Sequence, residues 1–262
     1  MFLSKDQVET FKSLGYLFIK NLFSDKEVSI LREEALRLYK KDRTEVVKEK
    51  NGKAVRTVFG IHKFSNVYSI LGQHPRVINP TKQLLGGDIY IHQFKLNAKE
   101  AFDGDVWQWH QDYGTWKNDD GMPEGLALNV AIFLDDVSNF NGPLNFIPRS
   151  HRDGYLNAGH DTVTTSYPLW TLSNKKISQL VSDGGIIAPI GKAGSAIFFD
   201  SSLVHGSPSN MSPWSRNIVY ISLNRTSNSI TKFSRPEYIA HRNFDAITSL
   251  EDNCLLNYDH KE

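Results

Sequence analysis

The sequence predicts a mainly β fold with flanking helices: a double-stranded β-helix (jelly roll) preceded by a helical buttress. Three observations carry this prediction: two capped helix patterns near the N-terminus, a series of short strand-like segments, and turn-forming clusters between those segments. With 262 residues the chain can bury a large core. We expect one domain over 1–262, with a helical part at about 1–45 and a jelly-roll core at about 85–230.

The helical part begins with two capping-box patterns. Ser4 is followed by Gln7, and Ser24 is followed by Glu27, each three residues later. Apolar residues then recur at helical spacing, which predicts helices ending near residues 14 and 40. The short apolar run 16–19 between them is a strand candidate.

The second half of the chain alternates between strand-like segments and turn residues. The expected strands are 88–97, 106–113, 126–134, 144–147, 195–199 and 217–223. Clusters rich in Asn, Gly, Pro and Ser separate several of them. The highly charged segment 42–53 is expected to be an exposed loop or a lid.

Charge and cysteine content limit the classes of partner and compartment. The formal net charge is only +1, so no overall field attracts nucleic acid or an anionic membrane. The single cysteine cannot form an internal disulfide, and neither a signal peptide nor a long apolar run is present. We therefore expect a cytoplasmic monomer or homodimer that acts on a small molecule.

A candidate metal site lies in the segment around residue 110. On a strand, His110 and Asp112 would point to the same face. We expect the strand 195–199 to bring His205 to them from the far side of the barrel. Two imidazoles and one carboxylate leave coordination positions open, as in non-haem Fe(II) oxygenases.

The short motif has rivals in the same chain. His151 with Asp153 and His260 with Glu262 have the same spacing. The first pair lies in a turn-rich stretch and the second at the C-terminal tail, so the motif at residue 110 is favoured. The alternative is that all these histidines are ordinary polar residues.

Arg216 follows His205 after a short loop. A guanidinium is the natural partner of a ligand carboxylate. If the loop joins adjacent antiparallel strands, Arg216 lies one strand away from the metal. An exposed ion pair is the alternative for Arg216 considered alone.

The strand 89–97 separates its side chains by type. One face would hold Tyr90, His92, Phe94 and Leu96. The other would hold Gln93, Lys95 and Asn97, which would either be solvated or line a pocket beside the metal.

Three blocks of sequence together resemble the phytanoyl-CoA dioxygenase family of Fe(II)/2-oxoglutarate oxygenases, and within it the ectoine hydroxylase branch. The first block runs from Tyr90-Ile91-His92-Gln93 and Asn97 through 109–116 to 119–123. The second covers 140–144 and 147–151. The third comprises His205-Gly206-Ser207, Asn210, Ser212-Pro213-Trp214 and Arg216.

The resemblance implies a role for each matched residue. The iron ligands and catalytic residues would be His110, Asp112 and His205. The residues for 2-oxoglutarate would be Arg216, Ser207, Lys95, Asn97 and Trp107. The substrate would contact Gln93 and Trp116, although Trp116 could equally be a core residue.

Some positions depart from the ectoine hydroxylase pattern. Gly114 replaces a usual acidic residue, and Gln111 replaces a usual serine. The basic residue expected after Gly121-Met122-Pro123 is also missing. The family resemblance therefore does not extend to ectoine as the substrate.

The resemblance implies an enzyme with Fe(II), 2-oxoglutarate and O2 as its cofactors. It would hydroxylate an unactivated C–H bond of a small polar metabolite, such as an amino acid, an ectoine-like solute or an aminophosphonate, with release of succinate and CO2. Because Asp112 supplies a carboxylate ligand, halogenation is disfavoured. Desaturation, cyclisation and a non-catalytic jelly roll that binds a small ligand remain alternatives.

Overall fold

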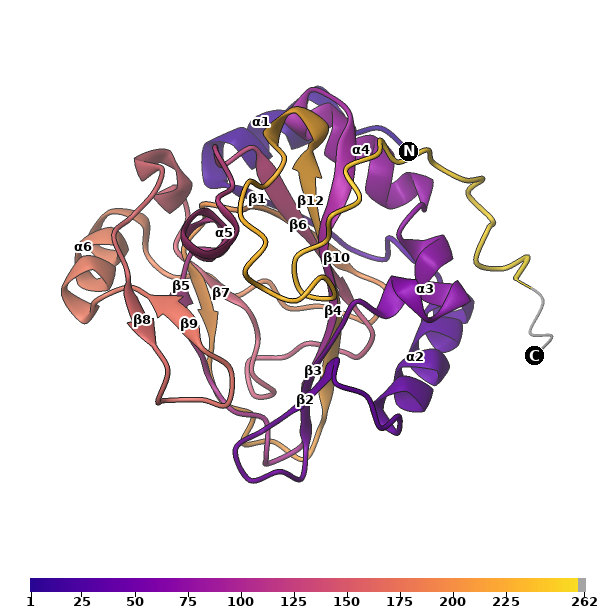
Figure 1. Cartoon of the computed structure of the whole chain (residues 1–262), viewed down its shortest axis with the longest axis horizontal. Helices are drawn as coiled ribbons and strands as arrows, with labels where there is room; N and C mark the ends of the chain where they lie inside the picture. The colour runs from indigo at the N-terminus through magenta and orange to yellow at the C-terminus, as the bar shows by residue number, and fades with distance from the viewer. Residues whose placement is uncertain (259–262) are drawn as a thin grey trace.

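Two antiparallel sheets form the centre of the protein (Figure 1), in a computed structural model that describes residues 1–258. The larger sheet has seven strands in the order β1-β10-β6-β12-β4-β3-β2. These strands are β1 (Tyr16–Ile19), β2 (Val46–Lys48), β3 (Val55–Phe59), β4 (Ile89–Lys99), β6 (Ala127–Phe133), β10 (Ala196–Asp200) and β12 (Arg216–Arg225).

A smaller three-stranded sheet has the order β5-β11-β7, and a separate hairpin pairs β8 with β9. These strands are β5 (Trp107–His110), β7 (Asn145–Phe146), β8 (Gly159–Asp161), β9 (Leu169–Thr171) and β11 (His205–Ser207).

Helices α2, α3 and α4 cover the larger sheet on the side away from the smaller one, with α2 and α3 on the right in Figure 1, whereas α5 and α6 lie on the side of the smaller sheet. The helices are α1 (Lys5–Leu14), α2 (Asp25–Tyr39), α3 (Asn66–Leu71), α4 (Pro75–Leu85), α5 (Asp112–Asp120) and α6 (Asn174–Gly184). Short 3-10 turns occur at Ile61–Lys63, Ser150–Asp153 and Thr226–Asn228.

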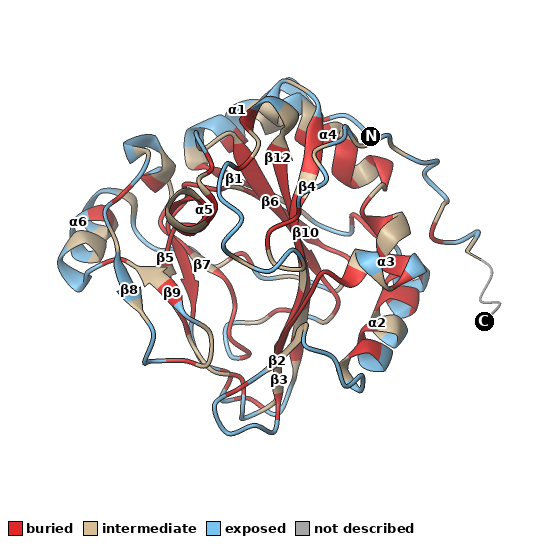
Figure 2. Ribbon diagram, viewed as in Figure 1, coloured by how far each residue is buried: buried red, intermediate tan, exposed pale blue. Residues whose placement is uncertain are grey.

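The central strands bury both of their faces (Figure 2). On β12, Val219 and Ile221 pack under the helices, whereas Ile218 and Tyr220 face the smaller sheet. The same alternation occurs on β6 and β10. Because each strand presents alternate side chains to opposite faces, one sheet supports the helical layer and the interior between the sheets.

The N-terminal predictions are confirmed in detail. Ser4 and Ser24 each form a complete capping box, with Gln7 and Glu27 as the reciprocal partners. The predicted strand 16–19 is β1, and the strands near 88–97, 126–134, 195–199 and 217–223 also form, with ends shifted by a residue or two.

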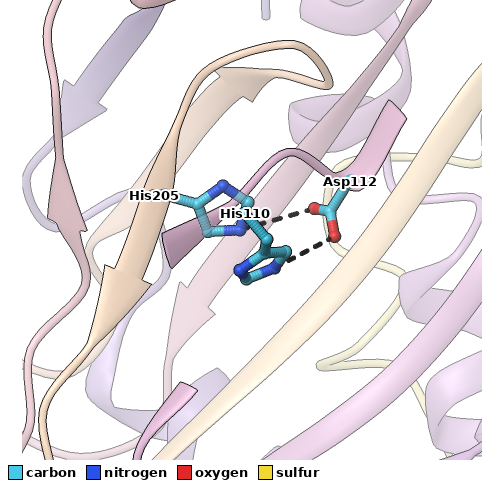
Figure 3. Close-up of side chains that lie close together, drawn as sticks. All are labelled: His110, Asp112 and His205. Atoms are coloured by element: carbon cyan, nitrogen blue, oxygen red, sulfur yellow. Dashed lines mark ion pairs between the residues drawn. The ribbon is translucent and has the colours of Figure 1, made fainter. Parts of the chain in front are cut away.

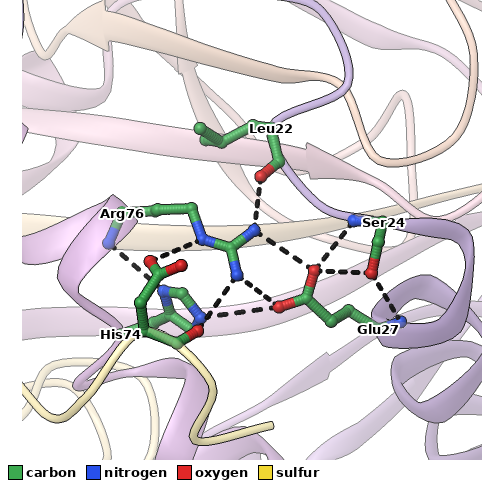
Figure 4. Close-up of polar contacts among 6 residues, drawn as sticks. Leu22, Ser24, Glu27, His74 and Arg76 are labelled. Atoms are coloured by element: carbon green, nitrogen blue, oxygen red, sulfur yellow. Dashed lines mark hydrogen bonds and ion pairs between the residues drawn. The ribbon is translucent and has the colours of Figure 1, made fainter. Parts of the chain in front are cut away.

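A buried ion pair joins the two helices α2 and α4 (Figure 4). Arg76 pairs with Glu27, which is 1% exposed, and also donates from Nη1 to the Leu22 carbonyl at 2.6 Å. Burial raises the pKa of Glu27, but the hydrogen bonds from Arg76 and Ser24 outweigh burial and leave it below its ordinary value. The helical layer is therefore fixed by charge as well as by apolar packing.

The expectation that 42–53 is an exposed loop or lid is wrong in part. Residues 46–48 form β2, and Glu49 is 5% exposed in an ion pair with Arg56, at 2.9 Å between Oε2 and Nη1. A run of charged residues in the sequence does not indicate which of them will be buried against an oppositely charged residue elsewhere in the chain.

The alternation expected along β4 is interrupted. The register of β4 against β12 shifts at His92, which creates a β-bulge. Phe94 and Leu96 pack under the helices, but His92 lies at 4.9 Å, between ring centroids, from Trp116 on the other side of the sheet. The prediction that Tyr90, His92, Phe94 and Leu96 share one face is therefore wrong.

Candidate active site

Three side chains with metal-binding atoms meet between the two sheets (Figure 3). His110, Asp112 and His205 each offer one ligand atom, and these atoms lie within 4.8 Å of one another. The Nε2 atoms of His110 and His205 are each 3.6 Å from a different carboxylate oxygen of Asp112. All three residues are buried. This donor set fits Fe(II) with positions left open for other ligands.

The two histidines come from neighbouring strands. His205 on β11 lies directly opposite His110 on β5, and their ring centroids are 4.2 Å apart. The expectation that His205 arrives from the far side of the barrel is therefore wrong. After β10 ends, a turn closed by the bond from Leu203 N to Asp200 O carries the chain into the smaller sheet beside β5.

Asp112 is not on a strand. β5 ends at His110, Gln111 is the N-cap, and Asp112 is the first residue of α5. The Gln111 side chain donates to the carbonyls of Gly154 and Ser202 and stabilises this turn. The predicted strand 106–113 is therefore too long. His110 and Asp112 do converge, but through the turn from β5 into α5 and not because alternate side chains of one strand share a face. A carboxylate at a helix N-terminus is favoured by the helix dipole.

The protonation states suit metal binding. His110 Nδ1 lies 2.6 Å from the Gln108 carbonyl and His205 Nδ1 lies 2.9 Å from the Leu203 carbonyl. These contacts place the proton on Nδ1 and leave Nε2 as a ligand. Burial and the neighbouring His110 lower the pKa of His205 to about 4. Burial raises the pKa of Asp112, but His205, His110 and Lys95 outweigh burial and keep it below its ordinary value.

Two polar residues that sequence reasoning missed hold the carboxylate. Asn129 on β6 donates from Nδ2 to Asp112 Oδ2 at 2.9 Å. Ser222 on β12 donates to the Asn129 side-chain oxygen at 2.6 Å. Both are fully buried. Their polar character within otherwise apolar strands was the available signal.

The rival motifs do not form a similar group in the part of the chain that the structure describes. His151 lies 3.0 Å, through Nε2, from the Lys12 carbonyl, and Asp153 pairs with Lys176 at 3.1 Å. His260 and Glu262 lie outside the described residues.

Arg216 begins β12 and is only 1% exposed, so the alternative of an exposed ion pair is wrong. Its Nε and Nη1 atoms are buried without a hydrogen-bond partner among the described residues. Tyr220, on the same face of β12, interacts with Arg216 and lines the cavity together with His110, Asp112 and His205. β11 and β12 belong to different sheets, so the loop between them does not join adjacent strands as expected.

The remaining predicted site residues lie around the same cavity. It is lined by the three metal ligands together with Gln93, Lys95, Asn97, Trp107, Trp116 and Ser207. The alternative of a solvated face for β4 is therefore wrong. Residues that were not predicted also line it: Thr115, Leu144, Tyr167, Leu169, Tyr220 and Arg235.

A family model described as phytanoyl-CoA dioxygenase matches residues 11–218. The chain belongs to this family. The resemblance seen in the sequence is thus confirmed, and so is the expected enzyme class, a dioxygenase.

Relatives of known activity are similar over most of the chain. The ectoine dioxygenase of Bordetella parapertussis is 36% identical over 271 residues, covering 97% of this chain and 88% of the relative. The L-proline trans-4-hydroxylase of Streptomyces griseoviridis is 33% identical and covers 92% of this chain and 94% of the relative. Two relatives with different named activities are therefore about equally similar to this chain.

A solved structure confirms the expected fold class. The crystal structure of EctD from S. alaskensis with 2-oxoglutarate and 5-hydroxyectoine has a TM-score of 0.85 at 33% identity, and covers 95% of this chain and 87% of that chain. The expected jelly-roll core with a helical buttress is thus confirmed for this chain.

Positive charge is concentrated beneath one end of the cavity. Lys99 and Arg56 are buried near Arg216, with Glu49 as a buried carboxylate partner of Arg56. Burial lowers the pKa of Lys99 well below its ordinary value, and the charges of Arg216 and Arg56 lower it further. The Ser207 hydroxyl is also buried without a hydrogen-bond partner among the described residues. Unpaired buried donors and excess positive charge fit an anionic ligand here.

A second positive charge stands on the other side of the cavity. Arg235 belongs to the C-terminal segment, and its Nε donates to Asp120 at 2.8 Å. Asp120 is fully buried and also lies 3.1 Å from His92 Nε2. His92 in turn contacts Trp116 edge-on. The sequence contained no signal for Arg235, because it follows the region covered by the resemblance.

The hairpin β8–β9 and the loop within it contribute to the wall of the cavity, whereas no residue of the charged segment 42–53 lines it. Tyr167 and Leu169 from this region line the cavity. The Tyr167 ring lies 5.9 Å from Trp107 and 5.5 Å from Phe59. Trp170 donates to Asp119 on α5 at 2.9 Å, which ties the hairpin to the site.

Among the described residues, no helix is both long enough and apolar enough to cross a membrane.

Proposed function

We propose that this chain hydroxylates an unactivated C–H bond of a small cyclic amino acid, using Fe(II), 2-oxoglutarate and O2 and releasing succinate and CO2. The observation that carries the proposal is the meeting of His110, Asp112 and His205 in a cavity that Arg235 lines, with the buried Arg216 next to Tyr220, another lining residue. Iron supplies the oxidising chemistry when bound, and 2-oxoglutarate supplies the electrons needed to activate O2.

The chain's own residues divide the cavity into two ends. Arg216, with two unpaired donors, holds the distal carboxylate of 2-oxoglutarate, and Ser207 donates beside it. Lys95 and Asn97 extend the same site along β4. The other end, between Trp116 and Arg235, is left for the substrate. With a charged group at each end, each ligand has one favoured orientation.

The substrate end suits a molecule with a carboxylate and a cationic ring. Asp120 holds Arg235 through Nε and Nη2, which leaves Nη1 to donate to a substrate carboxylate. Trp116 offers an aromatic surface for a cationic ring nitrogen. The Gln93 amide donates to the Ile239 carbonyl at 3.0 Å, which leaves its oxygen to accept from such a ring. Ectoine and L-proline, the compounds named in the relatives' activities, both have this chemistry.

Gly114 bears on the choice within this class. A Cβ at this position would meet only the Gln111 side chain, at 3.9 Å. The fold therefore has room for a Cβ here, yet this chain lacks the acidic side chain that the ectoine hydroxylase pattern usually carries at this position. A ring without ectoine's amidine, such as proline, needs no acidic partner at that position.

The test is a substrate panel with the Fe(II)-loaded enzyme. L-proline, ectoine and related cyclic amino acids are incubated with 2-oxoglutarate and O2, and succinate and a product heavier by one oxygen atom are quantified by mass spectrometry. We expect one compound to give succinate and hydroxylated product in equal amounts. A product lighter by two hydrogens would indicate desaturation or cyclisation instead. Absence of substrate-dependent succinate across the panel would refute the substrate class.

A further inference from the structure

Arg56 lies against Trp107, one of the residues that line the cavity. The Arg56 guanidinium carbon is 3.9 Å from the centroid of the Trp107 ring. Arg56 is held in place by Glu49, at 2.9 Å, and by the Val106 carbonyl, to which Nη2 donates at 2.7 Å. All three side chains, those of Arg56, Glu49 and Trp107, are at least nine-tenths buried. The stack is therefore shielded from solvent, where a cation–π contact is strongest.

The indole N–H of Trp107 has no hydrogen-bond partner among the described residues, although the atom is buried. Trp107 pairs in register with Ser207, whose hydroxyl is also buried and unpartnered. Both residues line the cavity. A buried donor without an acceptor carries a penalty of about 1–3 kcal/mol, so two neighbouring ones indicate a ligand that accepts from both.

We infer that the Trp107 indole N–H donates a hydrogen bond to a carboxylate of 2-oxoglutarate, and that Arg56 and Glu49 are positioning residues that act through Trp107. The inference rests on the proposed 2-oxoglutarate site. Arg56 donates to Glu49 and to the Val106 carbonyl and is not among the residues that line the cavity, so it supports the indole instead of binding the ligand. The guanidinium plane fixes the ring's orientation and withdraws electron density from it, which makes the N–H a better donor.

The experiment is an anaerobic calorimetric titration of 2-oxoglutarate into the Fe(II)-loaded enzyme, without substrate. Trp107→Phe removes the N–H but keeps an aromatic ring under Arg56. Arg56→Lys keeps the charge near Glu49 but removes the planar stack. The double variant completes a mutant cycle. The matched control is Arg43→Lys, because Arg43 also stacks on a ring, Phe64 at 4.2 Å, and pairs with Glu45, but away from the cavity.

We expect Trp107→Phe to weaken 2-oxoglutarate binding roughly 10-fold, the effect of losing one hydrogen bond to a charged group. Arg56→Lys should weaken it about 3- to 10-fold in the natural background but less than about twofold when Trp107 is already Phe. Arg43→Lys should leave the affinity unchanged. Melting temperatures of all variants identify any that are unfolded.

Glu49→Gln provides a second route to the same result, because it releases Arg56 without altering the stack's atoms. It should weaken 2-oxoglutarate binding in the natural background and have little effect in Trp107→Phe. Unchanged affinity in Trp107→Phe overturns the inference, and so do equal effects of Arg56→Lys in both backgrounds. If the unaltered protein does not bind 2-oxoglutarate at all, the proposed function itself fails, which is a different outcome.

Discussion

His205 lies directly opposite His110 in the β5–β11 pair, and each imidazole contacts, through Nδ1, the carbonyl of the residue two positions before it. The same kind of local contact therefore orients both rings on the paired strands. Both Nε2 atoms are left facing Asp112. The relative position of the two imidazoles is therefore set by the backbone of the smaller sheet.

Replacing His205 with alanine should abolish stable iron binding and hydroxylation, because two protein ligands do not complete the facial set. Iron content is measured after anaerobic loading and desalting. His151→Ala is the control and should leave the iron content unchanged, since His151 Nε2 lies 3.0 Å from the Lys12 carbonyl and His151 does not line the cavity. Full iron retention by His205→Ala would contradict the assignment.

Asn129→Ala should weaken iron binding or lower activity by about 10- to 100-fold, the usual effect of losing a hydrogen bond to a metal ligand. Asn129 donates to Asp112 and fixes which carboxylate oxygens face the histidines. A chelator competition assay measures the affinity. Ser222→Ala, which removes only the partner of Asn129, should have a smaller effect in the same direction.

Arg235→Gln should raise the KM for the substrate at least about 10-fold, because a charge-assisted hydrogen bond to a carboxylate is lost. The KM for 2-oxoglutarate should not change, since Arg235 lies at the other end of the cavity. Asp120→Asn should give a weaker version of this effect, because it loosens Arg235 without removing it. Parallel increases in both KM values would show that the two ends are not separate.

Asp200 gives a pH dependence with a definite sign. Burial raises its pKa to about 6, so the folded state favours the neutral form. Its contribution to stability is complete below about pH 4 and is lost as the pH rises through about 6. Asp200→Asn should therefore gain up to about 2–3 kcal/mol relative to the natural protein at pH 8, and much less at pH 4.5. Urea unfolding at both pH values measures this; equal differences would contradict it.

Arg76→Met should destabilise the fold by about 3–5 kcal/mol, because it leaves the Glu27 carboxylate buried without its cation. Adding Glu27→Gln should recover part of the loss, since no charge then remains unpaired. Arg37→Met is the comparison on α2, the helix that carries Glu27. The Arg37 side chain is 47% exposed, so this change should lower the free energy of unfolding by less than about 1 kcal/mol. Urea unfolding at neutral pH compares the three.

Local features were predictable because neighbouring residues determine them. Ser4 and Ser24 cap their helices through contacts only three residues long. The apolar strands near 126–134 and 195–199 formed as expected, since a nearly continuous run of apolar residues is read along the chain. The predicted strand 106–113 failed after residue 110, because the turn at Gln111 depends on bonds to Gly154 and Ser202, which are distant in sequence.

By itself, the sequence determined the fold class, the family and the identity of the three metal-binding side chains, because residue types and their spacing carry that information. Only the tertiary structure decided that His205 is a neighbour of His110, that Arg216 is buried on the larger sheet next to Tyr220, which lines the cavity, and that Arg235 lines the cavity as well. It also turned the charged segment around Glu49 into a buried support for Arg56. The physical reason is that pairing between strands, and between buried charges, joins residues whose separation along the chain leaves no local pattern.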